Sequence, residues 1–166
     1  PLSRISPFLV KAVLIAEDDK FWSHDGFDYE SIKEAVEKDL QAGKLKFGGS
    51  TISQQLAKNL YLSPGKSFWR KILEAFLTWR MERVLSKKRI LELYLNVVEW
   101  GDGVFGAEAA SRHYFEKPAS MLSPREAARL AVVLPSPRKL NPTGTQRYVD
   151  IRAEVIYRIM QKRGIV

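Results

Sequence analysis

The sequence contains no cysteine and only two histidines, His24 and His113. The lack of cysteine excludes a disulfide framework, a thiol nucleophile and a cysteine-based zinc site, although it says nothing about the cellular compartment. Two histidines argue against a histidine-rich metal centre. No apolar run approaches the roughly 20 residues of a membrane-spanning helix, and no signal peptide is recognisable. The sequence thus points away from disulfide-stabilised, thiol-dependent and membrane-spanning classes.

The charge of the chain is strongly unbalanced. It holds 27 Lys and Arg residues against 19 Asp and Glu residues, a formal net charge of +8. This excess predicts an anionic partner: a nucleic acid, a membrane surface or a phosphate-bearing substrate. With 166 residues, 45% of them hydrophobic and 28% charged, the chain has the composition of a globular protein and the length of one domain.

The spacing of apolar residues predicts helices through almost the whole chain. Near the N-terminus, an apolar stripe follows Ser6-Pro7, which is typical of an N-cap and a first helical residue. Two further starts carry the pattern of a capping box, Thr51 with Gln54 and Ser123 with Glu126. We find no convincing period-two alternation and no internal repeat. We therefore expect an all-α fold.

Carboxylates gather at the end of the first predicted helix. Glu17 extends the apolar stripe of that helix and is followed at once by Asp18 and Asp19. A carboxylate at the edge of a buried face is a candidate for acid–base chemistry. The alternative is a partly buried glutamate paired with a nearby lysine or arginine. His24, just beyond, is more simply a hydrogen-bonding residue than a metal ligand.

The third predicted helix carries a neutral polar face with one cation. Thr51, Gln54, Gln55 and Lys58 line this face. A solvated helix face usually mixes charges of both signs, whereas this one suits a groove that binds a sugar or a phosphate. An ordinary polar helix surface remains the alternative.

A cluster of cations follows. Lys66, Arg70 and Glu74 recur every four residues, with Lys71 beside them. Together with Lys58, these cations could hold a diphosphate, and Glu74 is compatible with two-carboxylate sugar chemistry. The alternative is an exposed Arg70–Glu74 ion pair, although a cation N-terminal to its anion is the weaker order. The four tryptophans could stack on sugars or enter lipid, but we expect most of them in the core.

Five segments resemble, in order, the five motifs of peptidoglycan glycosyltransferases, glycosyltransferase family 51. Residues 48–59 read GGSTISQQLAKN, which resembles the second motif closely enough to be persuasive alone. The match runs from about Ile5 to Pro142, and one departure is Glu116, where many members have glycine. The other matching segments are Glu17–Asp28; Arg70, Lys71 and Glu74; Ile90–Asn96 with Gly101, Gly106, Ala109, Tyr114 and Phe115; and Leu122, Glu126, Ala127, Leu130, Ala131, Pro135 and Pro137.

The resemblance implies a fold and an activity. The fold would be helical and lysozyme-like, with a larger lobe and a small membrane-contacting lobe, in one glycosyltransferase domain over residues 1–166. The chain most resembles the monofunctional biosynthetic transglycosylases, which share this domain with class A penicillin-binding proteins. Such enzymes polymerise lipid II into β-1,4-linked glycan with inversion and release undecaprenyl diphosphate. Members normally have an N-terminal membrane helix, so we expect this chain to be a trimmed form.

The resemblance also assigns residues. Glu17 matches the general base and Glu74 the second catalytic carboxylate. The remaining matches would bind the substrate or hold the site together: Asp18, Ser50, Thr51, Gln54, Lys58, Lys66, Arg70, Lys71 and Asn96. A divalent cation, Mg²⁺ or Mn²⁺, would bridge the diphosphate, with Asp18 as a possible ligand, and no organic cofactor is expected.

The implied partners are lipid II, the growing glycan, a membrane surface and proteins of cell-wall synthesis or division, with no nucleic acid. The implied location is the outer, periplasmic face of the bacterial inner membrane. Two other readings stay open. A lysozyme-like hydrolase would share the catalytic glutamate but would not need cations for a diphosphate. A nucleic-acid-binding or membrane-binding module would explain the charge alone and leave the acidic first motif unexplained.

Overall fold

The computed structural model describes residues 1–41, 49–62, 65 and 67–166, with the backbone alone for residues 35, 36 and 38–41. The predicted all-α class is confirmed, and one short hairpin is added to it. The elements are η1 (Leu2–Arg4), α1 (Pro7–Glu17), α2 (Tyr29–Gln41), α3 (Ile52–Tyr61), α4 (Phe68–Val84), α5 (Lys87–Val97), β1 (Glu99–Gly101), β2 (Val104–Phe105), α6 (Ala107–Phe115), η2 (Ala119–Met121), α7 (Pro124–Val133) and α8 (Arg147–Lys162).

The chain divides into two compact units. The first unit joins Pro1–Asp19 to Leu95–Val166, and the second is the continuous segment Lys20–Tyr94. The first division therefore falls directly after the acidic run Glu17–Asp19, and the second falls within α5. The expectation of a single domain over residues 1–166 stays a prediction.

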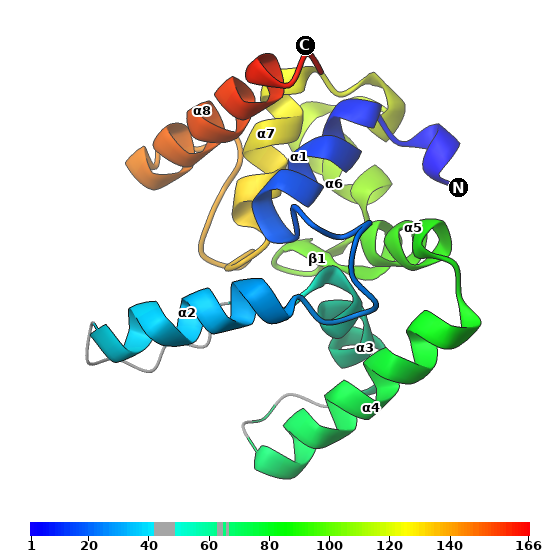
Figure 1. Ribbon diagram of the computed structural model, residues 1–166. Coiled ribbons are helices and arrows are strands. Elements are labelled where there is room, and N and C mark those ends of the chain that lie inside the picture. The colour runs from blue at the N-terminus through cyan, green and yellow to red at the C-terminus, as the bar shows by residue number, and fades with distance from the viewer. Residues whose placement is uncertain (42–48, 63–64, 66) are drawn as a thin grey trace. The chain divides into compact units, whose positions relative to one another are not determined.

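Helix α7 is the centre of the first unit, where it packs against both α1 and α8 (Figure 1). It fits there because its apolar residues recur on one wide face, as hydrophobic burial requires. The core that results is almost purely apolar, and its fully buried members include Leu9, Ala12, Val13, Ala127, Leu130, Ala131, Val149 and Met160.

Helices α3 and α4 pack against each other in the second unit. The buried apolar residues of this unit are Phe21, Ile52, Leu56, Ala57, Met81, Ile90, Leu91 and Tyr94. Several polar groups are buried beside them, namely Asp28, Thr51, Ser53, Gln54, Glu74 and Thr78. Because a buried polar group needs a hydrogen-bond partner, this unit depends on specific polar contacts as well as on apolar packing.

Both predicted capping boxes are confirmed. Thr51 and Gln54 close the N-terminus of α3, and Ser123 and Glu126 close that of α7, each with the reciprocal pair of hydrogen bonds. Ser6 precedes α1 as predicted but does not cap it with its side chain. Its hydroxyl instead donates to the carbonyl of Leu122 at 2.9 Å, which ties the start of α1 to the segment before α7.

Two expectations of the sequence need correction. Three of the four tryptophans are exposed, Trp22 to 53%, Trp69 to 76% and Trp79 to 40%, and Trp100 alone is buried. The chain also contains an antiparallel hairpin, in which Glu99 of β1 pairs with Phe105 of β2. Strands of three and two residues are too short to give a period-two pattern in the sequence.

Glu116, the departure from the family pattern, ends α6 in the left-handed conformation, with φ of 56° and ψ of 28°. Glycine adopts this conformation without the steric cost of a Cβ, so it is the usual residue after a helix end of this kind. The structure thus gives a backbone reason for glycine at this position and no chemical one.

Candidate active site

The acidic run lies at the C-terminal end of α1. Glu17 is the last helical residue and is half-buried, and Asp18 is the buried C-cap residue, whose N–H donates to the carbonyl of Leu14 at 2.9 Å. The C-terminus of a helix carries partial negative charge, so helix stability disfavours carboxylates there. Consecutive acids at this position are therefore better explained by function than by folding.

Asp19, the third acid of the run, is held by the other end of the first unit. The guanidinium of Arg163, just after α8, donates to both carboxylate oxygens, at 2.5 Å and 2.7 Å. The hydrogen bonds that Arg163 donates to Asp19 raise the pKa of Arg163 above its ordinary value, against the opposing effect of burial. This bidentate pair ties the residue just after the C-cap of α1 to the end of α8.

The second unit begins with the loop of residues 20–28, which leads into α2. Asp28 accepts hydrogen bonds from the N–H of Ser31 at 3.0 Å and from its hydroxyl at 2.6 Å, and so caps α2. Burial acts to raise the pKa of Asp28, but the bonds from Ser31 and the charges of Lys20 and His24 outweigh it and lower the pKa. Asp28 is thus an anion with a structural task.

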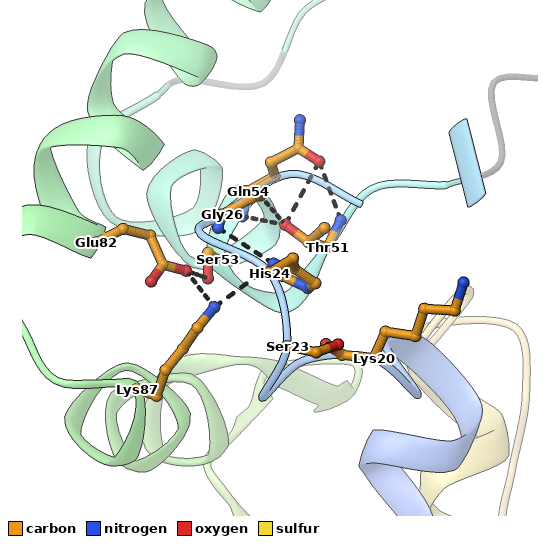
Figure 2. A network of polar contacts seen from close by, with 9 residues as sticks. All are labelled: Lys20, Ser23, His24, Gly26, Thr51, Ser53, Gln54, Glu82 and Lys87. Atoms are coloured by element: carbon orange, nitrogen blue, oxygen red, sulfur yellow. Dashed lines mark hydrogen bonds and ion pairs between the residues drawn. The ribbon is translucent and has the colours of Figure 1, made fainter. Parts of the chain in front are cut away.

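The turn of this loop requires glycine at position 26. Gly26 has φ of +93°, and a Cβ there would lie 3.0 Å from side-chain carbons of both Thr78 and Glu82 on α4. The carbonyl of Gly26 accepts a hydrogen bond from the hydroxyl of Thr51 at 2.7 Å. The first and second motifs are therefore joined directly, as Figure 2 shows.

The predicted substrate-binding residues of α3 differ in what their side chains do. Thr51 and Gln54 are buried and bonded to each other, since the amide oxygen of Gln54 accepts from the N–H of Thr51 at 3.0 Å. Lys58 is half-buried in the last turn of α3, and Ser50 is half-buried just before its N-cap. The side chains of Thr51 and Gln54 are thus engaged in bonds within the second unit, to each other and to the Gly26 carbonyl.

Helix α4 supplies the predicted cations and the second carboxylate. Glu74 is only 3% exposed, and its carboxylate pairs with the ammonium of Lys71, three residues earlier. The alternative of an exposed Arg70–Glu74 pair is therefore wrong, because Glu74 faces the interior and meets Lys71. Arg70 is half-buried in the first turn of α4.

The remaining candidates lie on α5 or outside the described residues. Asn96 is exposed near the end of α5, and its backbone carbonyl lies 2.7 Å from where a Cβ of Gly106 would stand. Glycine at position 106 thus lets the backbone approach Asn96 closely. Lys66 and Gly48 lie outside the described residues. Glu17, Asp18 and Asn96 belong to the first unit, and the other described candidates belong to the second.

A cavity of about 870 Å³ opens in the second unit between the loop of residues 20–30 and the C-terminal half of α4. Its lining mixes charges of both signs with several aromatic rings, and includes Lys20, His24, Asp28, Trp79, Glu82 and Arg83. The guanidinium of Arg83 lies 4.3 Å from the centre of the Trp79 ring. Such a lining suits a polar ligand better than an apolar one.

Sequence reasoning missed two charged residues of this unit, Glu82 and Lys87. The carboxylate of Glu82 accepts from the ammonium of Lys87 at 2.8 Å and from the hydroxyl of Ser53, and both charged side chains are largely buried (Figure 2). The signal was present in the spacing, because Glu74, Thr78 and Glu82 recur every four residues and so share one face of α4.

The described residues contain no group of three or more His, Asp or Glu side chains placed to hold a metal ion. In the same part of the chain, no helix combines the length and the apolar character needed to cross a bilayer.

Comparison with known proteins relates almost the whole chain to one family. The family described as Transglycosylase matches residues 1–161. A protein of Aromatoleum aromaticum named biosynthetic peptidoglycan transglycosylase is 61% identical over 161 residues, which cover 95% of this chain and 70% of that protein. Proteins of the same name are 59% identical in Nitrosospira multiformis, over 83% of this chain and 60% of theirs, and 53% identical in Laribacter hongkongensis, over 95% and 69%. The chain thus spans about two thirds of the length of these relatives.

Proposed function

Because the chain belongs to the transglycosylase family, glycosyltransferase family 51, we propose that it polymerises lipid II into β-1,4-linked glycan strands and releases undecaprenyl diphosphate. The relatives' name, biosynthetic peptidoglycan transglycosylase, supports the reaction class. The observation that carries the proposal is the acidic run Glu17–Asp19 at the negative end of α1. Carboxylates at this end of a helix lower its stability, and the pair with Arg163 accounts for Asp19 alone, so catalysis is the proposed reason for Glu17 and Asp18.

Glu17 is the general base in this proposal. Its carboxylate takes the proton from the 4-hydroxyl of the acceptor sugar as that oxygen bonds to C1 of the donor. The bond from C1 to the diphosphate oxygen breaks, and its electron pair leaves with undecaprenyl diphosphate. Since a diphosphate is already a good leaving group, it needs neutralisation of charge more than a proton.

The cations of the second unit supply that neutralisation. Lys58 on α3 and Arg70 on α4 are half-buried on two helices that pack together. Lys66, which lies between these helices in sequence, is proposed to act with Lys58 and Arg70 as a third cation on the diphosphate. Lys71 is already paired with buried Glu74, and this pair supports an orienting role for Glu74 rather than a nucleophilic one.

We propose that a membrane surface presents the substrate. The outer side of α4, here called its apolar face, consists of exposed residues at helical spacing: Phe68, Trp69, Ile72, Leu73, Phe76 and Trp79. An exposed apolar patch of this kind on a helix with interleaved cations is typical of a segment that lies in the membrane interface. The net charge of +8 favours anionic lipid. This surface fits an enzyme at the periplasmic face of the inner membrane.

We also propose that Mg²⁺ or Mn²⁺, where it takes part, is bound chiefly by oxygens of the substrate's diphosphate. The support is the lack of a three-ligand acidic or histidine cluster among the described residues, which leaves Asp18 as the protein ligand to test. Manganese binding followed by electron paramagnetic resonance should be weak with the protein alone and strong only after lipid II is added. Tight binding by the protein alone would overturn this proposal.

The polymerisation proposal is tested with purified protein, labelled lipid II, a divalent cation and detergent. A ladder of glycan products should form, and Glu17→Gln should reduce its rate by at least ~10²-fold, the usual scale for a general base. Glu154→Gln, at an exposed ion pair on α8, is the matched control and should polymerise normally. Lys58→Ala should weaken binding of the donor.

Other outcomes separate the alternatives. Cleavage of preformed peptidoglycan without polymer would identify a hydrolase of the lysozyme type. Salt-sensitive RNA binding without either activity would identify a nucleic-acid-binding module. Normal polymerisation by folded Glu17→Gln would remove Glu17 from the mechanism.

A further inference from the structure

Buried Ser53 and largely buried Lys87 of the second unit both donate hydrogen bonds to one carboxylate, that of Glu82. The Glu82 side chain is 7% exposed and lies on the inner side of α4, one helical turn after Thr78. Its oxygen Oε1 accepts hydrogen bonds from Ser53 on α3 and from Lys87 at the start of α5. Its Cγ stands 3.0 Å from the place that a Cβ of Gly26 would occupy. Glu82 therefore lies against two segments that are distant from it in sequence, α3 and the loop of residues 20–28, and against the start of α5.

Lys87 extends these contacts to the loop of residues 20–28. Its ammonium lies 3.5 Å from Nδ1 of His24 and 4.5 Å from the centre of the buried Phe21 ring. Nδ1 of His24 also accepts a hydrogen bond from the N–H of Gly26 at 3.1 Å. Figure 2 shows the ring of His24 between Lys87 and the Gly26 turn.

Stability alone gives a weak reason for such an ion pair. Burial of two opposite charges costs desolvation that their attraction repays only in part, and an apolar pair of similar volume is often as stable or more so. What the pair supplies is a fixed orientation of the segments it joins, because the Lys87 ammonium and the Glu82 carboxylate form their hydrogen bond in a single geometry. The segments it fixes are the ones that carry Thr51 and Lys58 on α3 and His24 in the loop.

We propose that Glu82 is a positioning residue for glycosyl transfer, which acts through Ser53 and Lys87 to hold α3 and the loop of residues 20–28 in their working arrangement. This inference rests on the proposed function. Glu82 takes no proton and contacts no reacting atom. Its loss should therefore lower kcat through misplacement of the groups it holds and leave KM for lipid II nearly unchanged.

The test compares Glu82→Gln with the double variant Glu82→Gln/Lys87→Met. The first keeps the shape of the side chain but leaves Lys87 without its counter-charge. The second also removes that buried cation, so its thermal midpoint should return to within ~4 °C of the wild type, a change of about 1 kcal/mol or less. Glu82→Gln should lower kcat by about 10-fold or more, as displacements below 1 Å can do. The double variant should stay equally slow despite its recovered stability.

Two further readouts keep the test decisive if Glu82→Gln alone fails to fold. Ser53→Ala removes one contact of Glu82, and combining it with Glu82→Gln/Lys87→Met should add little further loss, because the residues act as one unit. The ¹⁵N resonance of His24 Nδ1 should shift in the double variant, which lacks the Lys87 ammonium. Glu154→Gln is the control and should leave kcat, KM and this resonance unchanged.

The outcomes are distinguishable. Recovery of kcat together with stability in the double variant would overturn the inference and make the pair merely structural. Wild-type kcat in Glu82→Gln would overturn it as well. A wild-type protein that forms no polymer from lipid II would overturn the proposed function, and the inference with it.

Discussion

Helix α7 of the first unit buries alanine, leucine and valine, whereas helix α4 of the second unit buries Glu74, Thr78 and Met81. The outer side of α4 is correspondingly apolar, with Phe68 and Trp69 each 76% exposed. Helix α7 thus buries its apolar side chains, whereas helix α4 exposes most of its apolar side chains and buries polar ones. Burial of apolar area stabilises α7 in its place, while α4 is oriented by polar contacts beneath it and keeps its apolar side available.

The comparison separates two uses of a helix. A helix such as α7 contributes to stability, and its buried residues give little indication of the chemistry that the protein performs. An α4-type helix exposes an apolar side that folding alone would have covered, and it buries charges that folding alone would have left in water. Both departures on α4 coincide with the residues that the proposed function needs.

The largest expected effect contrasts two leucines. Leu130→Ala on α7 empties a fully buried position and should lower the free energy of unfolding by about 2–5 kcal/mol. Leu73→Ala on α4 removes a side chain that is 46% exposed, so the loss should stay below ~1 kcal/mol. Urea unfolding of both variants measures the difference. Equal losses would mean that the outer side of α4 is packed rather than exposed.

The second contrast concerns membrane binding. Trp69→Ser/Phe76→Ser removes two rings from the apolar face of α4 and should weaken binding to phosphatidylglycerol-containing vesicles by at least ~100-fold, since each ring contributes roughly 1.5–3 kcal/mol when fully buried. The matched control, Tyr148→Ser/Ile151→Ser, removes exposed apolar residues from α8 of the first unit. Vesicle sedimentation should find the control unchanged. A similar loss of vesicle binding in both double variants would show that the apolar face of α4 has no special role in membrane binding.

Features that depend on residues close in sequence could be predicted in both units, whereas features that depend on contacts between residues far apart in sequence could not. The capping boxes of α3 and α7 were predictable because each joins residues three positions apart. Helical spacing can put the α4 aromatics on one side of a helix, but it does not say whether another element covers that side. The tryptophans were therefore misassigned to the core.

The same limit, that a sequence pattern does not report long-range contacts, determines which residues of the candidate site could be predicted. Glu17 and Glu74 stand out in sequence because both match recognisable motifs. The role of Glu82 depends on Ser53, 29 residues earlier, and no local pattern reports a contact across that separation. Motif matching also grouped Thr51 with substrate-binding residues, whereas its hydroxyl already bonds to the Gly26 carbonyl in the second unit.

The two capping boxes provide the third contrast. Ser123→Ala at the exposed start of α7 should lower stability by about 1 kcal/mol and leave polymerisation intact. Thr51→Ala removes the equivalent cap of α3 and also leaves the buried Gly26 carbonyl without its donor, so the loss should be about 2 kcal/mol. Thr51→Ala should reduce polymerisation as well. Identical behaviour in unfolding and activity assays would show that Thr51 is only a helix cap.

The smallest expected effect is acid sensitivity, probed by one carboxylate in each unit. In the first unit, burial favours a higher pKa for Glu126, but bonds from Lys117 and Ser123 outweigh it and lower the pKa below its ordinary 4.5. In the second unit, Asp28 has its pKa lowered below its ordinary 3.8, because the bonds from Ser31 outweigh the opposing effect of burial.

A lowered native pKa means that the unfolded chain binds the proton more readily, so each contribution is complete above the ordinary pKa and is lost as the pH falls through the native one. The stability difference between the wild type and Glu126→Gln should therefore be constant near neutral pH and begin to shrink close to pH 4.5. For Asp28→Asn it should persist to lower pH, beginning to shrink close to pH 3.8. Urea unfolding at a series of pH values resolves the order. A difference that grows on acidification would reverse the sign of the linkage and remove these carboxylates as contributors to native stability in either unit.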